Sequence, residues 1–238
     1  MLNGSRQNTQ EASLFRTLEL YSTVKYVITV HMDEQPRIGR VLPVVVIEDA
    51  RHADALGASL VKGGLAAAEV TLRTDAGLDA IKSLAVRDDL VVGAGTVLSA
   101  AQADAAIAAG ARFVVTPGFA PAVVRACQDA GVPVFPGVAT ATEIQMAVDA
   151  GLGIVKFFPA QQLGGAQTIK ALSAPYRGVR FIPTGGVTTA VMPEYLALPA
   201  VLAVGATSIA PADLIAGERW DEITARAAEA LAVAGGTA

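Results

Sequence analysis

The chain has 238 residues, of which 53% are hydrophobic and 17% are charged, and its formal net charge is −4. This composition excludes a largely disordered protein, and nothing in it indicates the basic surface expected for binding to nucleic acid or an anionic membrane. A single cysteine excludes a disulfide within the chain, and two histidines leave little material for a histidine-based metal centre.

One uncharged stretch, Tyr195–Ala212, is apolar enough to raise the question of a membrane span. It contains Pro199, Gly205 and Pro211, which favour a buried strand between turns over a spanning helix of about 20 apolar residues. The apolar stretch Val24–Val30 is short and interrupted by a lysine, so it does not fit a signal peptide. We therefore expect a cytoplasmic protein without a membrane partner.

From Val41 onward, short β-branched runs alternate with alanine-rich helical stretches. Successive runs begin 19 to 26 residues apart, and eight of them occur. They are VLPVVVI, AAAEVTLR, LVVGAGTV, FVVTPG, VPVFPGVA, IVKFFPA, RFIPTGGV and VLAVGATSI. Because the runs are apolar on both faces, they predict parallel strands covered by helices, and eight such units predict a (β/α)8 barrel over residues 39–238. An open doubly wound sheet is the alternative, but the first turn lacks the glycine fingerprint of a dinucleotide fold.

Several helical stretches carry start and stop signals. Helices are predicted over residues 49–62, 99–109, 121–130 and 140–150, and each is followed by a glycine. Asp49 and Ser99 fit N-caps, Pro121 fits a first helical turn, and Thr140 with Glu143 fits a capping box.

Residues 1–38 lie outside the repeat. We expect an added helix or hairpin on the barrel end, or a disordered tail. A third interpretation is that the start codon is assigned too early and that Met32 is the true first residue.

The second run places three polar side chains on one face. Because side chains alternate along a strand, Glu69, Thr71 and Arg73 share a face, while Val70 and Leu72 share the other. If the apolar pair faces the helices, a carboxylate and a guanidinium point toward the barrel axis. Burying an unpaired charge is costly, so these groups indicate either a functional site or an internal ion pair.

Lys156 is unusual because it lies within the apolar run IVKFFPA. Removing an ammonium group from water favours the free amine, which attacks a carbonyl carbon to form a Schiff base. The structural alternative is an ion pair with Glu69. Because the carboxyl ends of barrel strands converge on one site, we favour the chemical interpretation.

Three glycine-containing turns complete the expected site. PTGGV contains Thr184, Gly185 and Gly186 after the seventh run, where barrels often bind phosphate through backbone N–H groups. GATS follows in the eighth run as 205–208, and GAGT in the third run ends at Thr96. Away from these turns, Cys127 is expected to be a small core residue and His52 a surface residue rather than a ligand.

These motifs, in this order, resemble the bacterial class I 2-keto-3-deoxy-6-phosphogluconate (KDPG) aldolases from about Val41 to near Ala230. The motifs that carry the resemblance are LPVVVI, EVTLRT, VGAGTV, TPG, FPG, KFFPA, PTGG and the last glycine turn. The resemblance implies a (β/α)8 barrel, a homotrimer, and no metal or cofactor. It also implies a phosphorylated keto-acid substrate, 2-dehydro-3-deoxy-6-phosphogluconate, cleaved reversibly to pyruvate and glyceraldehyde 3-phosphate in the Entner–Doudoroff pathway. Related members cleave 4-hydroxy-2-oxoglutarate to pyruvate and glyoxylate.

The resemblance also implies roles for individual residues. Lys156 matches the Schiff-base lysine, and Glu69 matches the general acid/base. The remaining matched positions bind or line the substrate: Arg73 and Thr96 at the pyruvyl carboxylate, Pro117 at the site wall, and Thr184, Gly185, Gly186, Gly205 and Thr207 on the phosphate side.

Two segments depart from the family pattern. The last turn usually reads Gly-Gly-Ser-Trp and is Gly-Ala-Thr-Ser here, and the segment after KFFPA usually opens Glu-Ala but opens Gln161-Gln162 here. Galactonate-type relatives tend to carry valine at the position of Thr184, which favours the gluconate substrate. The alternatives are a galactonate-type aldolase, a phosphosugar isomerase or epimerase on the same barrel, and a barrel kept only as an assembly scaffold.

Overall fold

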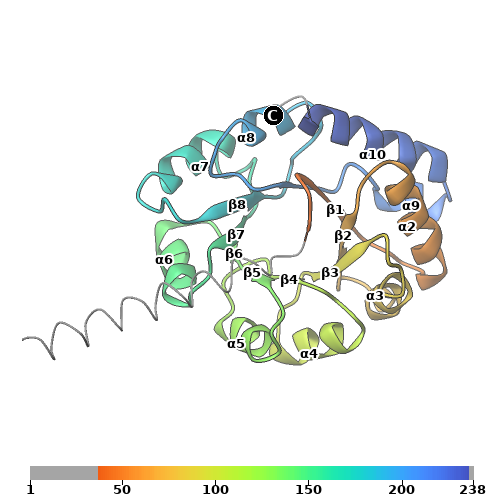
Figure 1. The fold of residues 1–238 in the computed structure, drawn as a ribbon, viewed down its shortest axis with the longest axis horizontal. Coiled ribbons are helices and arrows are strands. Elements are labelled where there is room, and N and C mark those ends of the chain that lie inside the picture. Colours follow the sequence, from red (N-terminus) through yellow and green to blue (C-terminus); the bar gives the residue numbers. More distant parts are fainter. Residues whose placement is uncertain (1–36, 236–238) are drawn as a thin grey trace, which may run out of the picture. The chain divides into compact units, whose positions relative to one another are not determined.

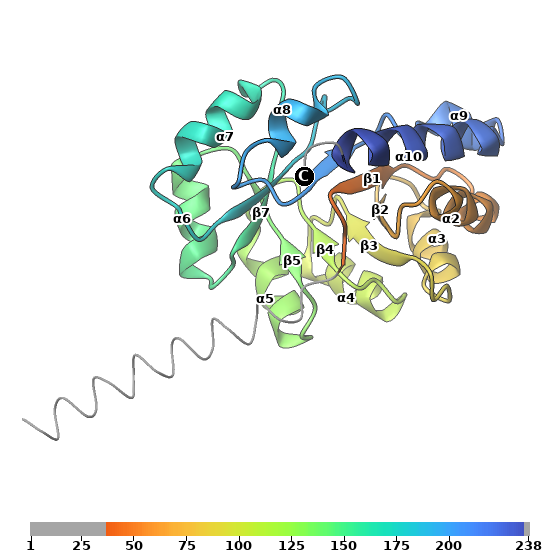
Figure 2. The same cartoon turned by 45° about the horizontal axis from the view of Figure 1, so that its top comes forward.

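The computed structural model describes residues 37–235, which belong to one compact unit. Parallel strands lie at the centre, and the helices are arranged around their outside (Figures 1 and 2). The predicted extension and the alternative start at Met32 lie almost entirely outside the described residues. None of the helices within 37–235 is long and apolar enough to cross a membrane.

The strands occur where the β-branched runs predict them. They are β1 (Val41–Val45), β2 (Ala67–Thr71), β3 (Val91–Gly95), β4 (Val114–Val115), β5 (Val134–Phe135), β6 (Gly137–Val138), β7 (Ile154–Phe157), β8 (Arg180–Pro183) and β9 (Val204–Ala206). One sheet has the order β5-β4-β3-β2-β1-β9, and a second has the order β6-β7-β8. Every pairing is parallel.

Two parallel bridges, Phe181 with Val201 and Thr184 with Gly205, join β8 to the segment of β9. At the other junction, β5 and β6 follow one another in the chain and together form the fifth position of the barrel. Pro136 separates them because proline has no backbone N–H to donate. Its carbonyl still accepts a hydrogen bond from the backbone N–H of Lys156 at 2.9 Å.

The helices confirm the predicted caps. They are η1 (Ala50–His52), α2 (Ala53–Lys62), α3 (Gly77–Leu84), α4 (Ala100–Ala108), α5 (Pro121–Asp129), α6 (Ala141–Asp149), α7 (Gly165–Ser173), α8 (Met192–Leu196), α9 (Ala212–Ala216) and α10 (Trp220–Gly235). The side chains of Asp49 and Ser99 accept backbone N–H groups at the starts of η1 and α4. Thr140 and Glu143 form the predicted capping box of α6. These side chains satisfy N–H groups that a helix cannot pair internally.

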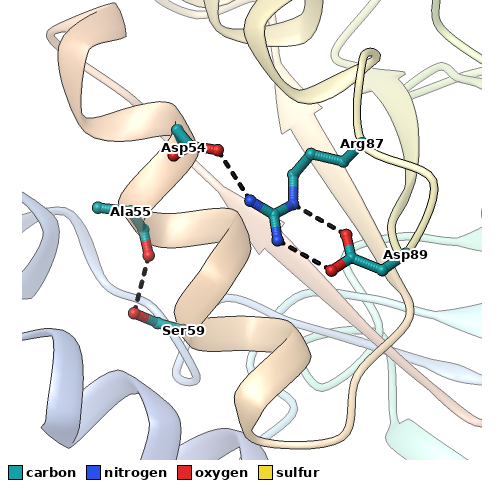
Figure 3. Close-up of polar contacts among 5 residues, drawn as sticks. All are labelled: Asp54, Ala55, Ser59, Arg87 and Asp89. Carbon is teal, nitrogen blue, oxygen red and sulfur yellow. Dashed lines mark hydrogen bonds and ion pairs between the residues drawn. The ribbon is translucent and has the colours of Figure 1, made fainter.

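A polar network ties α2 to the loop between α3 and β3 (Figure 3). Arg87 donates to Asp54 at 2.8 Å and to both carboxylate oxygens of Asp89 at 2.9 Å. A Cβ built on Gly57 would lie 2.7 Å from a methyl group of Leu84 and 3.2 Å from the Arg87 side chain. Glycine in α2 therefore lets α3 and the arginine stem approach the helix closely.

The apolar residues form two clusters. The larger one lies between the strands and the surrounding helices. The smaller one is formed by residues of the strands and of the segments next to them, namely Ile38, Leu42, Ala67, Phe113, Val115, Phe135, Ile182 and Ala203. Ile182 of this cluster is the register partner of Lys156 in β7, so the cluster reaches the level of that lysine along the strands.

Candidate functional site

Lys156 and Glu69 meet inside the barrel. Lys156 is the third residue of β7 and Glu69 is the third residue of β2, and these strands are four positions apart in either direction around the eight-position ring. The Lys156 Nζ atom lies 3.1 Å from Glu69 Oε1, and the side chains are 7% and 1% exposed. A lysine and a glutamate from opposite walls therefore form a direct, buried ion pair at the barrel axis.

An aromatic ring lies beside the pair. The ring of Phe158 lies 5.4 Å from Lys156 Nζ, close enough for a cation–π contact. Thr71, two residues after Glu69 in β2, donates its hydroxyl to the Val45 carbonyl at 3.1 Å. Its hydrogen bond therefore goes to a backbone carbonyl and not to Lys156 or Glu69. Low exposure strengthens the attraction between the two charges and keeps bulk water from the amine.

Three further predicted residues follow the ends of β2, β3 and β4. Arg73 is exposed, lies two residues beyond β2, and lines a surface cavity of about 300 Å³ together with Asp75 and Gln102. Thr96 follows β3 with φ 56°, a left-handed conformation that a β-branched residue rarely adopts. Pro117 is half-buried and packs its backbone against Gly137. Within residues 37–235, none of the three forms a hydrogen bond or ion pair with Lys156 or Glu69.

The predicted phosphate residues gather where β8 and β9 end. Thr184 is buried and bridges to Gly205, and a side chain on Gly205 would collide with that of Thr184. Gly185 and Gly186 follow with φ 99° and 75°, a conformation that glycine adopts without strain. Thr207 is exposed beyond β9. The structure thus brings Thr184 and Gly205 into contact and places the glycine turn beside them.

Sequence reasoning gave Thr116 no role, although it organises the wall next to Lys156. Its buried hydroxyl donates to the Gly118 carbonyl at 2.6 Å and accepts from the Gly137 N–H at 3.3 Å. Gly137 is in turn the register partner of Lys156. A threonine directly before Pro-Gly at the end of an apolar run was the available signal.

The expectation that His52 is a surface residue is wrong. His52 is 6% exposed, its ring lies 5.9 Å from that of Trp220, and its Nε2 lies 3.4 Å from a carboxylate oxygen of Glu218. The loop before α10 covers the start of α2, which a local pattern around position 52 does not reveal. Within residues 37–235 no group of histidine, cysteine and acidic side chains could hold a metal ion.

Cys127 is fully buried in α5, as predicted for a small core residue. Burial raises the pKa of its thiol to about 11, and the charge of Asp104 contributes in the same direction. The thiol is therefore kept neutral.

The fold and the ion pair together give the class of protein: a closed parallel α/β barrel with a polar site in its interior. The family model described as "KDPG and KHG aldolase" matches residues 32–226. The chain is 46% identical over 197 residues to 2-dehydro-3-deoxy-phosphogluconate aldolase of Treponema pallidum, covering 82% of this chain and 94% of the relative. It is 40% identical over 194 residues to the KHG/KDPG aldolase of Escherichia coli K12, covering 81% and 91%. The chain therefore belongs to the KDPG and KHG aldolase family.

Solved structures agree with this assignment. The KDPG aldolase of Zymomonas mobilis ZM4, crystallised with 3-phosphoglycerate, is 41% identical, with a TM-score of 0.76 over 85% of this chain and 94% of that one. The KDPG aldolase of Legionella pneumophila, with pyruvate captured as a covalent carbinolamine, is 38% identical, with a TM-score of 0.78 over 80% and 93%. This likeness and the strand pairing confirm the predicted (β/α)8 barrel and exclude the open doubly wound sheet.

Proposed function

We propose that this chain is a class I aldolase that cleaves 2-dehydro-3-deoxy-6-phosphogluconate to pyruvate and glyceraldehyde 3-phosphate. The observation that carries the proposal is the buried contact between Lys156 Nζ and Glu69 Oε1 at 3.1 Å. It joins the two groups that such a reaction requires, an amine nucleophile and a proton carrier. Membership of the aldolase family supports the same chemistry.

The pair can begin the reaction without an external base. The Glu69 carboxylate takes a proton from the Lys156 ammonium, and the free amine adds to the C2 carbonyl of the substrate to form a carbinolamine. The protonated Glu69 then supplies a proton to the departing hydroxyl, which leaves as water, and an iminium forms between Lys156 and C2. Glu69 is a carboxylate again after this step.

Carbon–carbon cleavage then uses the same two residues. Glu69 removes the proton of the C4 hydroxyl, directly or through a water, and the C3–C4 bond breaks to release glyceraldehyde 3-phosphate. The bonding electrons move into the iminium and give an enamine on Lys156. Return of the proton from Glu69 to C3 regenerates the iminium, and addition of water releases pyruvate and the amine.

The remaining predicted residues hold the two ends of the substrate. In this proposal Arg73 and Thr96 bind the pyruvyl carboxylate, for which an arginine can supply two parallel hydrogen bonds, and Pro117 lines the site. The phosphate binds at the ends of β8 and β9, where the assigned residues are Thr184, Gly185, Gly186, Gly205 and Thr207. The left-handed glycines make a turn that backbone N–H groups can use to bind an anion.

We also propose that the enzyme acts as a cytoplasmic homotrimer, that 4-hydroxy-2-oxoglutarate is a second substrate, and that Thr184 favours the gluconate acid over its galactonate epimer. A coupled assay of pyruvate release, run with all three acids, tests this order of substrates. Equal turnover of the gluconate and galactonate acids would contradict the role given to Thr184.

Trapping with borohydride tests the covalent step. Incubation with pyruvate and borohydride is expected to attach pyruvate irreversibly to Lys156, as read by peptide mass. Lys156→Met should abolish the adduct. Lys170→Met is the matched control because Lys170 is exposed on α7, and it should leave the adduct unchanged. A wild-type enzyme that forms no adduct, or forms it on Lys170, would overturn the proposal.

A further inference from the structure

A buried tyrosine reaches the loop that follows the Schiff-base strand. Tyr195 lies in α8, is 1% exposed, and donates its hydroxyl to Gln161 Oε1 at 2.7 Å. This is the usual length of a good O–H···O hydrogen bond. Gln161 belongs to the loop between β7 and α7, five residues after Lys156. The two partners are 34 residues apart in the chain, so the bond joins separate segments.

The loop that contains Gln161 packs directly on the predicted phosphate turn. The backbone N–H of Ala160 donates to the Thr184 carbonyl at 2.8 Å, and that of Gln161 donates to the Gly185 carbonyl at 3.0 Å. A Cβ built on Gly185 would lie 3.1 Å from Pro159 Cα. The position of this loop therefore fixes the position of the turn.

Gln161 also touches the second glycine of the turn with its side chain. A Cβ built on Gly186 would lie 2.7 Å from Gln161 Cβ, so the side chain of Gln161 rests against the glycine backbone. On the other side, a Cβ built on Gly165 would lie 3.3 Å from the Tyr195 hydroxyl oxygen. Gln161 is thus held between the turn on one side and Tyr195 on the other.

These contacts link the glycine turn, α8 and Gln161 in a closed circuit. The chain runs from the glycine turn into α8, Tyr195 returns from α8 to Gln161, and Gln161 contacts the turn again. Two consecutive glycines with positive φ have few intrinsic restraints, so their N–H groups point at a ligand only if the surroundings fix them. The hydrogen bond from Tyr195 supplies such a restraint by holding Gln161 against the turn.

We propose that Tyr195 is a positioning residue for the phosphate end of the substrate, and that it acts through Gln161 on the Gly185–Gly186 turn. The inference rests on the proposed function, because it assumes that this turn receives the phosphate. Burial, and to a lesser extent the charge of Glu194, raise the pKa of Tyr195, so its hydroxyl remains a donor over the pH range of an assay.

Tyr195→Phe tests the inference because it removes one hydroxyl and preserves the ring. The kinetic constants are measured for 2-dehydro-3-deoxy-6-phosphogluconate and for the same acid without its phosphate. We expect KM for the phosphorylated acid to rise about three- to tenfold, the effect of one lost hydrogen bond. We expect kcat to stay within about twofold, and kcat/KM for the unphosphorylated acid to be unchanged, because the restraint acts only at the phosphate end.

Gln161→Met provides a second route to the same loss. Methionine keeps the Cβ and Cγ that contact Gly186 but has no carbonyl to accept the Tyr195 hydroxyl. It should reproduce the rise in KM, and the double variant should be no worse than either single one, because both remove the same bond. Tyr176→Phe is the matched control, since the Tyr176 hydroxyl donates to the Ala141 carbonyl at 3.0 Å in another part of the barrel.

The outcomes separate this inference from the proposed function. A wild-type enzyme that cleaves neither acid would overturn both. An active wild-type enzyme whose Tyr195→Phe variant keeps its preference for the phosphorylated acid would overturn the inference alone. Equal losses of kcat on the two acids would also overturn it, because they would indicate general damage to the fold.

Discussion

The Glu69 carboxylate occupies the space next to Gly95 in which any other residue would place its side chain. A Cβ built on Gly95 would lie 2.5 Å from Glu69 Cγ, closer than real Cβ atoms approach a neighbour. Glu69 and Gly95 lie on the paired strands β2 and β3, with Gly95 opposite Thr71. The absence of a side chain at position 95 is therefore what allows the carboxylate to lie where it meets Lys156.

Gly95→Ala is accordingly expected to displace the carboxylate and to lower kcat for aldol cleavage by about 100-fold, the lower end of what a positioned acid–base group contributes. The coupled pyruvate assay measures the loss, and circular dichroism checks the fold. Gly178→Ala is the matched control, because a Cβ there has nothing within 4 Å. A Gly95→Ala enzyme with wild-type turnover would show that Glu69 does not need this position.

Removing one partner of the ion pair is expected to lower the stability of the fold. Lys156→Met leaves the Glu69 carboxylate buried without its partner, so we expect the free energy of unfolding to fall by about 3–5 kcal/mol. Replacing both charges, as in Lys156→Met with Glu69→Leu, removes the unpaired charge and should recover most of that loss. Urea unfolding of the three proteins measures both effects. If Lys156→Met were as stable as the wild type, the Glu69 carboxylate would not be buried at a cost when its partner is removed, and the prediction would be wrong.

Local signals explain why so much of the fold is predictable. The strands are short β-branched runs, and the helices begin at side chains such as Ser99 and Thr140 that bond to the first turn. Each signal depends on residues close in sequence, so it can be recognised without knowledge of the tertiary structure. The fifth run predicts one strand, but the structure divides it at Pro136 into β5 and β6, because a proline cannot donate within a sheet.

The features that the sequence pattern did not predict depend on contacts between segments that are distant in the chain. His52 is buried because Trp220 and Glu218 cover it, 168 and 166 residues further along the chain. The alternation that groups Glu69 with Thr71 ends with β2, so it does not fix the position of Arg73. Of the candidate site, the sequence pattern identified Lys156 and Glu69 as unusual, but only the barrel closure brings them within 3.1 Å.

The hydroxyl of Thr116 offers a test of the wall beside Lys156. Thr116→Val keeps the shape but leaves the Gly137 N–H without its acceptor, so we expect a loss of about 1–3 kcal/mol in unfolding free energy. Thr116→Ser keeps the hydroxyl and should be clearly more stable than the valine variant. Urea unfolding compares the two, and a valine variant as stable as the serine variant would refute the role of the hydrogen bond.

Cys127 provides a test of how closed the packing beneath α5 is. Its thiol has a pKa of about 11, raised from an ordinary 9.0 by burial first and by Asp104 second, so at pH 8 only about one thiol in a thousand is the reactive thiolate. The preference for the neutral thiol stabilises the fold below pH 9, and this contribution is lost as the pH rises through about 11.

A thiol reagent such as 5,5′-dithiobis(2-nitrobenzoate) should label the native protein at least about 100-fold more slowly than the urea-unfolded chain, because both low thiolate content and burial oppose attack. Because the chain has one cysteine, the absorbance change reports this residue alone. Native labelling as fast as that of the unfolded chain would mean that α5 opens readily from the barrel.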